Sequence, residues 1–136
     1  SIRVQGQTYS IQPLPREDAA PFHTKITIDS NLQFYEVSET FEASVSWYSP
    51  VETCADGRRE NCVTASGTSP VAAKTIACPR RYGFGTRILI EGIGERICTD
   101  RLHPLFDSRF DVFTESYAEA KTFGKQKREA KVLRPL

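Results

Sequence analysis

Short runs of alternating apolar and polar residues, separated by turn residues, limit the fold of this chain more than any other feature. In the clearest run, residues 41–48, every second residue from Phe41 to Trp47 is apolar. Similar strand-like runs follow at residues 75–78, 87–91, 95–99, 109–113 and 128–133. Alternation with period two is typical of strands that are buried on one face. We therefore predict an all-β fold with Trp47 in its core.

Turn and cap residues predict the connections between these strands. Gly92 and Gly94 indicate a hairpin between two of the runs. Ser116 and Glu119 have the spacing of a capping box, and Gly124 marks the end of the short helix that this box begins. We expect strands, then one short helix, then a closing strand.

Two aspartates lie where strands meet a loop. Asp100 ends one strand-like run, and Asp111 lies inside the next. Two such carboxylates joined by a short loop are expected to face one cleft. This arrangement suits acid–base chemistry on a glycosidic bond, in which a carboxyl donates a proton to the leaving oxygen. The alternative is a structural role, as a turn residue or as the ion-pair partner of Arg101 or Arg109.

An ordered series of short motifs resembles the three-aspartate (3D) domain. The series is Thr64-Ala-Ser-Gly-Thr68, Thr75-Ile-Ala-Cys-Pro79, Phe84-Gly-Thr-Arg-Ile-Leu-Ile-Glu-Gly92, Thr99-Asp100 and Phe110-Asp111. The 3D domain is the catalytic module of membrane-bound lytic transglycosylase A and of several secreted cell-wall enzymes. Gly85-Thr86 and Asp100-Arg101 are also similar to rare lipoprotein A and, more distantly, to expansins. The resemblance implies a six-stranded double-psi β-barrel.

The resemblance also sets the expected domain boundary. Residues 39–136 are expected to form the 3D-like barrel, and residues 1–38 to form a strand-containing N-terminal extension that the family does not need. This extension either packs on the barrel or serves as an arm for self-assembly or for a surface partner.

The activity implied by the resemblance is that of a lytic transglycosylase acting on cell-wall peptidoglycan. In this reaction one carboxyl protonates the bridging oxygen and then takes the proton of the sugar's 6-hydroxyl as an anhydro ring closes, so no water is activated. Asp100 corresponds to the second family aspartate and is the expected acid, with a pKa raised by burial or by Asp111. Asp111 corresponds to the third family aspartate and is expected to hold or tune Asp100.

Five further residues are expected to contact the glycan. Tyr48 lies at a strand end where the family's cleft begins, and stacking on a sugar ring is weighed there against plain packing. Thr64, Ser66 and Gly67 correspond to a family segment on the cleft floor, where small residues let the backbone approach substrate. The alternative for this segment is a tight turn into the next strand. Arg101 follows the expected acid directly.

Two departures from the family pattern favour a different function. Cys78 stands where the family has its first aspartate, and the glycines that usually follow the second aspartate are absent after Asp100. Both changes favour a non-catalytic module that binds polysaccharide or builds a surface, virion or filament assembly. Asp111, retained eleven residues after Asp100, favours the enzyme. A hydrolase would need another carboxylate near the first strand, where Glu42 and Glu52 are the nearest candidates.

The four cysteines indicate an oxidising compartment. They contain no Cys-x-x-Cys spacing and lie far from both histidines, so we expect no metal site. Among the three possible pairings we predict Cys54–Cys62, which closes a polar loop, and Cys78–Cys98, which joins two strands beside the aspartates. The protein is therefore expected to be secreted or extracytoplasmic, in the periplasm, at the cell surface or on a virion.

Composition narrows the possible partners. The formal net charge is +1, from 18 basic and 17 acidic residues, so we expect no nucleic-acid partner. No run approaches the roughly 20 apolar residues of a membrane-spanning helix. The expected partner is cell-wall polysaccharide, and no cofactor is expected.

Overall fold

The computed structural model describes residues 2–4, 7–9, 26–28 and 33–136. Its elements are β1 (Ile2–Val4), β2 (Gln7–Tyr9), β3 (Ile26–Ile28), β4 (Phe34–Tyr48), α1 (Pro50–Thr53), η1 (Ala55–Gly57), η2 (Arg59–Asn61), β5 (Thr75–Ala77), β6 (Arg87–Ile90), β7 (Gly94–Asp100), η3 (Pro104–Phe106), β8 (Phe110–Phe113), α2 (Tyr117–Phe123) and β9 (Lys125–Pro135). The chain divides into two compact units, residues 1–40 with 131–136 and residues 41–130. Much of the predicted extension, residues 1–38, lies outside the described residues.

The first unit joins the two ends of the chain through β-pairing. β1 pairs with β2, and β3 pairs with the start of β4, both antiparallel. The amide of Leu136 donates a hydrogen bond to the carbonyl of Phe34 at 3.0 Å. Glu36 and Arg134 form an ion pair between exposed parts of the same two strands. The last residues of β9 therefore lie along the first residues of β4.

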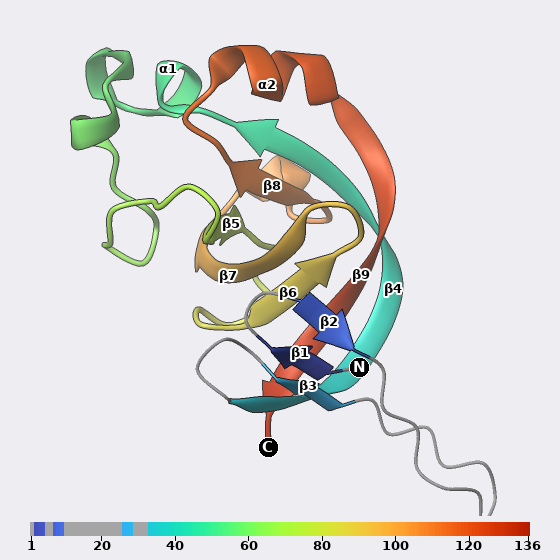
Figure 1. The fold of residues 1–136 in the computed structure, drawn as a ribbon. Helices are drawn as coiled ribbons and strands as arrows, with labels where there is room; N and C mark the ends of the chain where they lie inside the picture. Colours follow the sequence, from blue (N-terminus) through green and yellow to red (C-terminus); the bar gives the residue numbers. More distant parts are fainter. Residues whose placement is uncertain (1, 5–6, 10–25, 29–32) are drawn as a thin grey trace, which may run out of the picture. The chain divides into compact units, whose positions relative to one another are not determined.

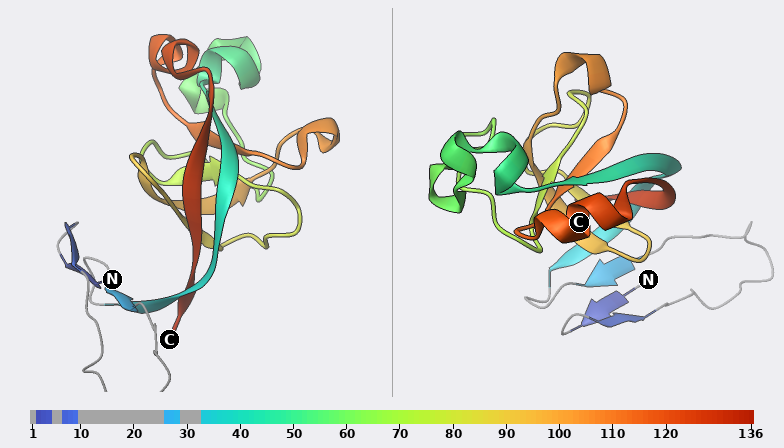
Figure 2. Two further views of the ribbon diagram at one scale, coloured as in Figure 1. Left: turned by 90° about the vertical axis from the view of Figure 1, so that its right-hand side faces the viewer. Right: turned by 90° about the horizontal axis from the view of Figure 1, so that it is seen from above.

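The second unit is a closed six-stranded barrel. Its strands follow the order β4, β8, β5, β7, β6 and β9, and the pairing of β9 with β4 closes it. The pairs β4–β8 and β5–β7 are parallel, whereas β5–β8 and β6–β7 are antiparallel. The predicted fold class, an all-β double-psi barrel with one short helix, is confirmed. Figures 1 and 2 show β4 and β9 side by side as long curved strands, with α1 and α2 at one end of the barrel.

The core consists of the inward-facing side chains of the barrel strands. The large apolar side chains with 1% exposure or less are Val45, Ile76, Ile88, Ile90, Phe110, Val112 and Phe113. Burying apolar area in this way is the main source of stability for such a domain.

The alternation of β4 changes at its end, so the prediction for Trp47 holds only in part. Trp47 is half-buried against Phe123 of α2, with ring centroids 5.6 Å apart. Its neighbour Tyr48 is the more deeply buried residue, with 6% of its surface exposed. Both aromatic residues have a packing partner, because Trp47 contacts Phe123 of α2 and Tyr48 contacts Phe113 of β8.

The predicted hairpin and helix cap are present. Ile90 pairs with Gly94, so β6 and β7 form the expected hairpin. The hydroxyl of Ser116 accepts a hydrogen bond from the Glu119 amide at 3.1 Å, and Gly124 with φ 64° follows the last turn of α2. No helix in the described ranges is long and apolar enough to cross a membrane.

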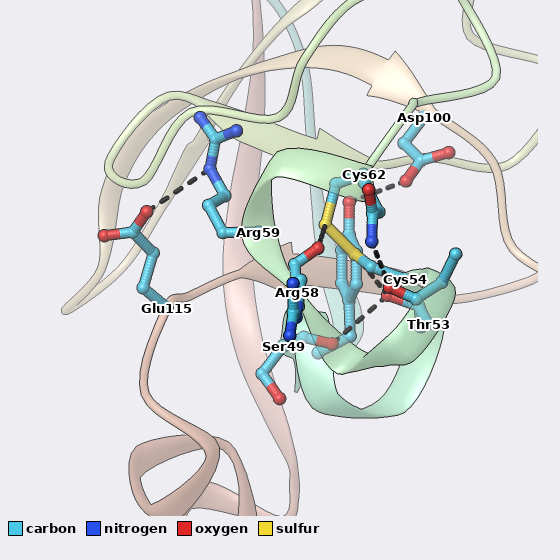
Figure 3. Close-up of a disulfide and its surroundings, with 11 residues drawn as sticks. Ser49, Thr53, Cys54, Arg58, Arg59, Cys62, Asp100 and Glu115 are labelled. Carbon is cyan, nitrogen blue, oxygen red and sulfur yellow. Dashed lines mark hydrogen bonds and ion pairs between the residues drawn. A yellow bond between two sulfur atoms is a disulfide. The ribbon is translucent and has the colours of Figure 1, made fainter.

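Both predicted disulfides are present. Cys54–Cys62 closes the loop that contains η1 and η2, directly after α1, with its Cα atoms 4.8 Å apart (Figure 3). Cys78–Cys98 joins the residue after β5 to β7, with its Cα atoms 5.7 Å apart, and both of its cysteines are fully buried. Two disulfides are consistent with an extracellular location.

Candidate functional site

The two aspartates lie on either side of Ala77 in the barrel wall. Strand β5 runs between β7 and β8, and Ala77 is paired with Asp100 on one side and Asp111 on the other. A register shift after Ile76 brings Asp100 into this row. Since neighbouring strands are about 4.8 Å apart, the backbones of the two aspartates are roughly 10 Å apart. The fold thus brings together two carboxylates that are eleven residues apart in the sequence.

A pocket of about 280 Å³ opens above Ala77, and both aspartates line it. Ala77 belongs to a buried core cluster with Tyr48, Leu102 and Phe113, and the first three of these four also line the pocket. The other walls come from Tyr48, Thr64, the Cys54–Cys62 disulfide and the loop after β7; from that loop Arg101, Leu102, His103, Phe106 and Arg109 contribute. Figure 3 shows Asp100 beside the loop that the disulfide closes. The volume is near the lower end for small-molecule sites.

Asp100 is held by three hydrogen-bond donors. Its Oδ1 accepts from the amides of Ala65 at 3.0 Å and Arg101 at 2.8 Å. Its Oδ2 accepts from the Tyr48 hydroxyl at 2.7 Å. Because every partner donates, Asp100 is arranged as a fixed acceptor.

Tyr48 belongs to the core and reaches the pocket through its hydroxyl. Its ring packs edge-on against Phe113, with centroids 5.4 Å apart. Burial first, and then the charge of Asp100, raise the pKa of Tyr48 far above its usual range, so the hydroxyl keeps its proton and donates it. The buried ring offers no open face for a sugar. This placement differs from the stacking considered for Tyr48 and makes the residue a support of Asp100.

Asp111 has a different environment from Asp100. Burial raises the pKa of Asp111 to about 6, although the hydrogen bond from Ser46 and the charge of Arg109 act in the opposite direction. The Ser46 hydroxyl donates to Oδ1 at 3.0 Å, from the position opposite Asp111 in the β4–β8 pairing. Among residues 33–136 Asp111 forms no ion pair with an arginine. Burial of the side chain is thus the largest influence on the pKa of Asp111.

The segment 64–68 forms a tight turn that closes one side of the pocket. The hydroxyls of Thr64, Ser66 and Thr68 lie 2.9 to 3.0 Å from one another and form a hydrogen-bonded triangle. Gly67 has a φ of 89°, which an L-residue rarely adopts, and no atom lies within 4 Å of where its Cβ would be. Its glycine is therefore required by the turn. Thr64 lines the pocket, whereas Ser66 and Gly67 are not among the lining residues.

Arg101 is the last of the predicted contact residues, and it lines the pocket. Its Nη1 donates to the carbonyls of Cys78 and Pro79, each at 3.3 Å. Its guanidinium carbon lies 4.2 Å from the centre of the Phe84 ring. Cys78 is fully buried in its disulfide and is not among the residues that line the pocket.

Sequence reasoning missed several groups that shape the site. Ser46 and the Ala65 amide hold the two carboxylates, and His103, Phe106 and Arg109 line the pocket. Ser46 was detectable only by knowing that β4 pairs in parallel with β8. In the part of the chain that the structure describes, no group of three His, Cys, Asp or Glu residues is arranged to hold a metal ion.

Replacing Asp111 with Asn is expected to stabilise the protein above the pKa of Asp111. The folded-state pKa of about 6 exceeds the usual 3.8, so the folded protein binds the proton more tightly. The stability from this proton is complete below about pH 4 and is lost as the pH rises through about 6. At about pH 7.5 the free energy of unfolding of the variant should therefore exceed that of the wild type by about 2 kcal/mol, after a reduction for solvent screening.

Urea unfolding at the two pH values checks this expectation. At about pH 4 the two proteins should differ little, because Asp111 is then protonated in the folded state. Asp107→Asn is a suitable control, because Asp107 pairs with Arg80 on the surface and such a pair contributes little. A variant that is equally or less stable at about pH 7.5 would show that Asp111 is not buried as described.

No protein-family model matches the chain, and no curated protein is significantly similar to it.

Proposed function

We propose that this protein cleaves the glycan strands of cell-wall peptidoglycan as a lytic transglycosylase, outside the cytoplasm. The observation that carries the proposal is the row Asp100–Ala77–Asp111, which places two carboxylates with different environments in one pocket. Enzymes that cleave glycosidic bonds commonly use two carboxyl groups with different pKa values. The two disulfides support a location outside the cytoplasm.

The environments favour Asp111 as the carboxyl that moves the proton. With a pKa of about 6, Asp111 is protonated in roughly half of the molecules at pH 6 and in about a tenth at pH 7, and the protonated form can donate to the bridging oxygen. The bond from the sugar C1 to that oxygen then breaks, and positive charge develops on the sugar ring. The resulting Asp111 carboxylate takes the proton of the 6-hydroxyl as its oxygen bonds to C1. One carboxyl thus serves twice, and no water is activated.

Asp100 has a complementary role in this scheme. Its three donors keep it in place as a charged acceptor, so it stabilises the positive charge that develops on the sugar. Tyr48 is a positioning residue, because it acts through Asp100. The family resemblance implies the double proton transfer for Asp100, whereas the hydrogen bonds of the site favour exchanging the two roles.

A second candidate is a non-catalytic polysaccharide-binding or assembly module. The observation in its favour is Cys78, which is buried in a disulfide. The family resemblance implies an aspartate at this position, so the pocket has two of the three aspartates that the 3D domain would provide. The small pocket volume is also compatible with binding a single sugar unit.

Incubation with purified peptidoglycan distinguishes the two candidates. The enzyme should release soluble glycan fragments, and the rate should fall as the pH rises above about 6, because Asp111 then loses the proton that it must donate. Sedimentation of the protein with insoluble peptidoglycan, without fragment release at any pH, would support the binding module and contradict the enzyme.

A further inference from the structure

The pocket is lined by Arg109, an arginine that acts on Asp111 through its charge but has no direct polar partner among the described residues. In the described ranges the guanidinium of Arg109 has neither a hydrogen-bond acceptor nor an ion-pair partner, and its Nε is buried. Its contact is with the Phe106 ring, whose centre lies 4.4 Å from the guanidinium carbon. A buried N–H group without an acceptor is destabilising, so such a group calls for a partner. A bound ligand would supply one.

Arg101 provides a second guanidinium in the same pocket. It is held in place by the carbonyls of Cys78 and Pro79 and by the face of the Phe84 ring. Its partners are neutral, so its charge is also uncompensated by an ion pair among residues 33–136. Stacking on an aromatic ring fixes the plane of a guanidinium before a ligand arrives. The two arginines are therefore arranged in advance for an anion.

We propose that Arg101 and Arg109 form a subsite for a carboxylate carried by a sugar of the bound glycan. This inference rests on the proposed function in so far as the pocket receives a glycan. The planar fork of an arginine matches the two oxygens of a carboxylate. His103 adds a donor, because its Nδ1 accepts from the Leu105 amide at 3.2 Å and leaves Nε2 to carry the N–H.

The charges around the pocket favour an anion with a single charge. The two arginines face the negative charge of Asp100 and the partial charge of Asp111, whose pKa is raised to about 6 by burial. Glu52 adds further negative potential at Asp111. The arginines and the acidic groups therefore nearly cancel near neutral pH, so the ligand must carry little charge. A carboxylate adds one negative charge, whereas a phosphate monoester with nearly two would be repelled more strongly by Asp100.

Binding of matched tetrasaccharides tests the subsite. One is the hyaluronan tetrasaccharide, in which glucuronic acid alternates with N-acetylglucosamine; the other is the same molecule with its carboxyl groups reduced to alcohols. Calorimetric titration should show that the acidic form binds about tenfold or more tightly, since a lost charge-assisted contact has effects of this size. Arg109→Gln should remove most of this difference, and Arg109→Lys should restore only part of it, because Lys lacks the fork.

Arg128→Gln is the matched control. Arg128 also stacks on an aromatic ring, that of Phe123, but does not line the pocket. Its removal lowers the net charge equally and should leave the preference for the acidic tetrasaccharide unchanged.

The outcomes separate the subsite from the proposed function. Equal affinity for the acidic and reduced tetrasaccharides would overturn the subsite while leaving a glycan-binding pocket in place. A preference that survives in Arg109→Gln would likewise contradict the role of Arg109. If neither tetrasaccharide binds and peptidoglycan is still cleaved, the subsite alone is wrong; if peptidoglycan is also untouched, both proposals fail.

Discussion

Replacing Asp111 with Asn is expected to lower the rate of peptidoglycan cleavage by about 10² or more, the usual contribution of a general acid. The substitution keeps the size of the side chain and an oxygen that can accept from Ser46, which donates to Oδ1 in the wild type. It removes only the proton that the proposed reaction transfers. Because the same change relieves a buried charge at neutral pH, the variant should be at once less active and more stable.

Asp100→Asn is the informative companion to this variant. It removes the charge that stabilises the developing positive charge on the sugar, and a loss of roughly 10² in rate is expected. What distinguishes the two variants is the pH profile of the remaining activity. Asp100→Asn should still lose activity as the pH rises, whereas in Asp111→Asn that dependence should disappear. Asp111→Asn with undiminished activity would remove Asp111 from the reaction.

Replacing Cys78 and Cys98 together with Ala is expected to cost about 3 kcal/mol of unfolding free energy, on the loop-entropy argument for the separation of 20 residues. For a domain of this size the melting temperature should fall by roughly 10 °C. Cys78 follows Ala77 directly, and Cys98 lies two residues before Asp100. Loss of the disulfide should therefore make the positions of Asp100 and Asp111 less fixed and lower the activity. Thermal unfolding followed by circular dichroism measures the first effect, and fragment release from peptidoglycan measures the second.

The other disulfide provides the comparison. Cys54–Cys62 spans 8 residues, so replacing both with Ala should cost somewhat less, about 2.5 kcal/mol. Its loop lines the pocket but lies outside the barrel strands, and the barrel should remain folded without it. If the loss of Cys54–Cys62 lowers the free energy of unfolding more than the loss of Cys78–Cys98, the loop disulfide contributes more to stability than the disulfide between strands, contrary to this expectation.

Local sequence signals were sufficient for the elements of the barrel and for its two disulfides. The alternation that leads up to Trp47, the hairpin at Gly94 and the helix that begins after Ser116 all depend on residues close together in the chain. Such patterns follow directly from the period of a strand and from the chemistry of turns and caps. The closed order of strands was inferred through a family resemblance, because local patterns do not specify which strands pair.

The chemistry of the site was less accessible, because it depends on pairings between distant segments. The register shift at Ala77 places Asp100 and Asp111 on either side of that residue. The local sequence around Ala77 does not predict this shift. The hydrogen bond from Ser46 and the burial that raises the pKa of Asp111 follow from the parallel pairing of β4 with β8. For the same reason the sequence does not specify that the two carboxylates lie on either side of Ala77.

The central claim is that the protein cleaves peptidoglycan as a lytic transglycosylase. Its most direct test is digestion of peptidoglycan in water enriched in the heavy isotope of oxygen, followed by mass spectrometry of the released sugars. A lytic transglycosylase closes the anhydro ring with the sugar's own 6-hydroxyl, so the products should be anhydro-sugars without heavy oxygen. Products that carry heavy oxygen at the new sugar end would show that water is the nucleophile and that the protein is a hydrolase. Intact peptidoglycan, with the protein folded and bound to it, would contradict cleavage altogether.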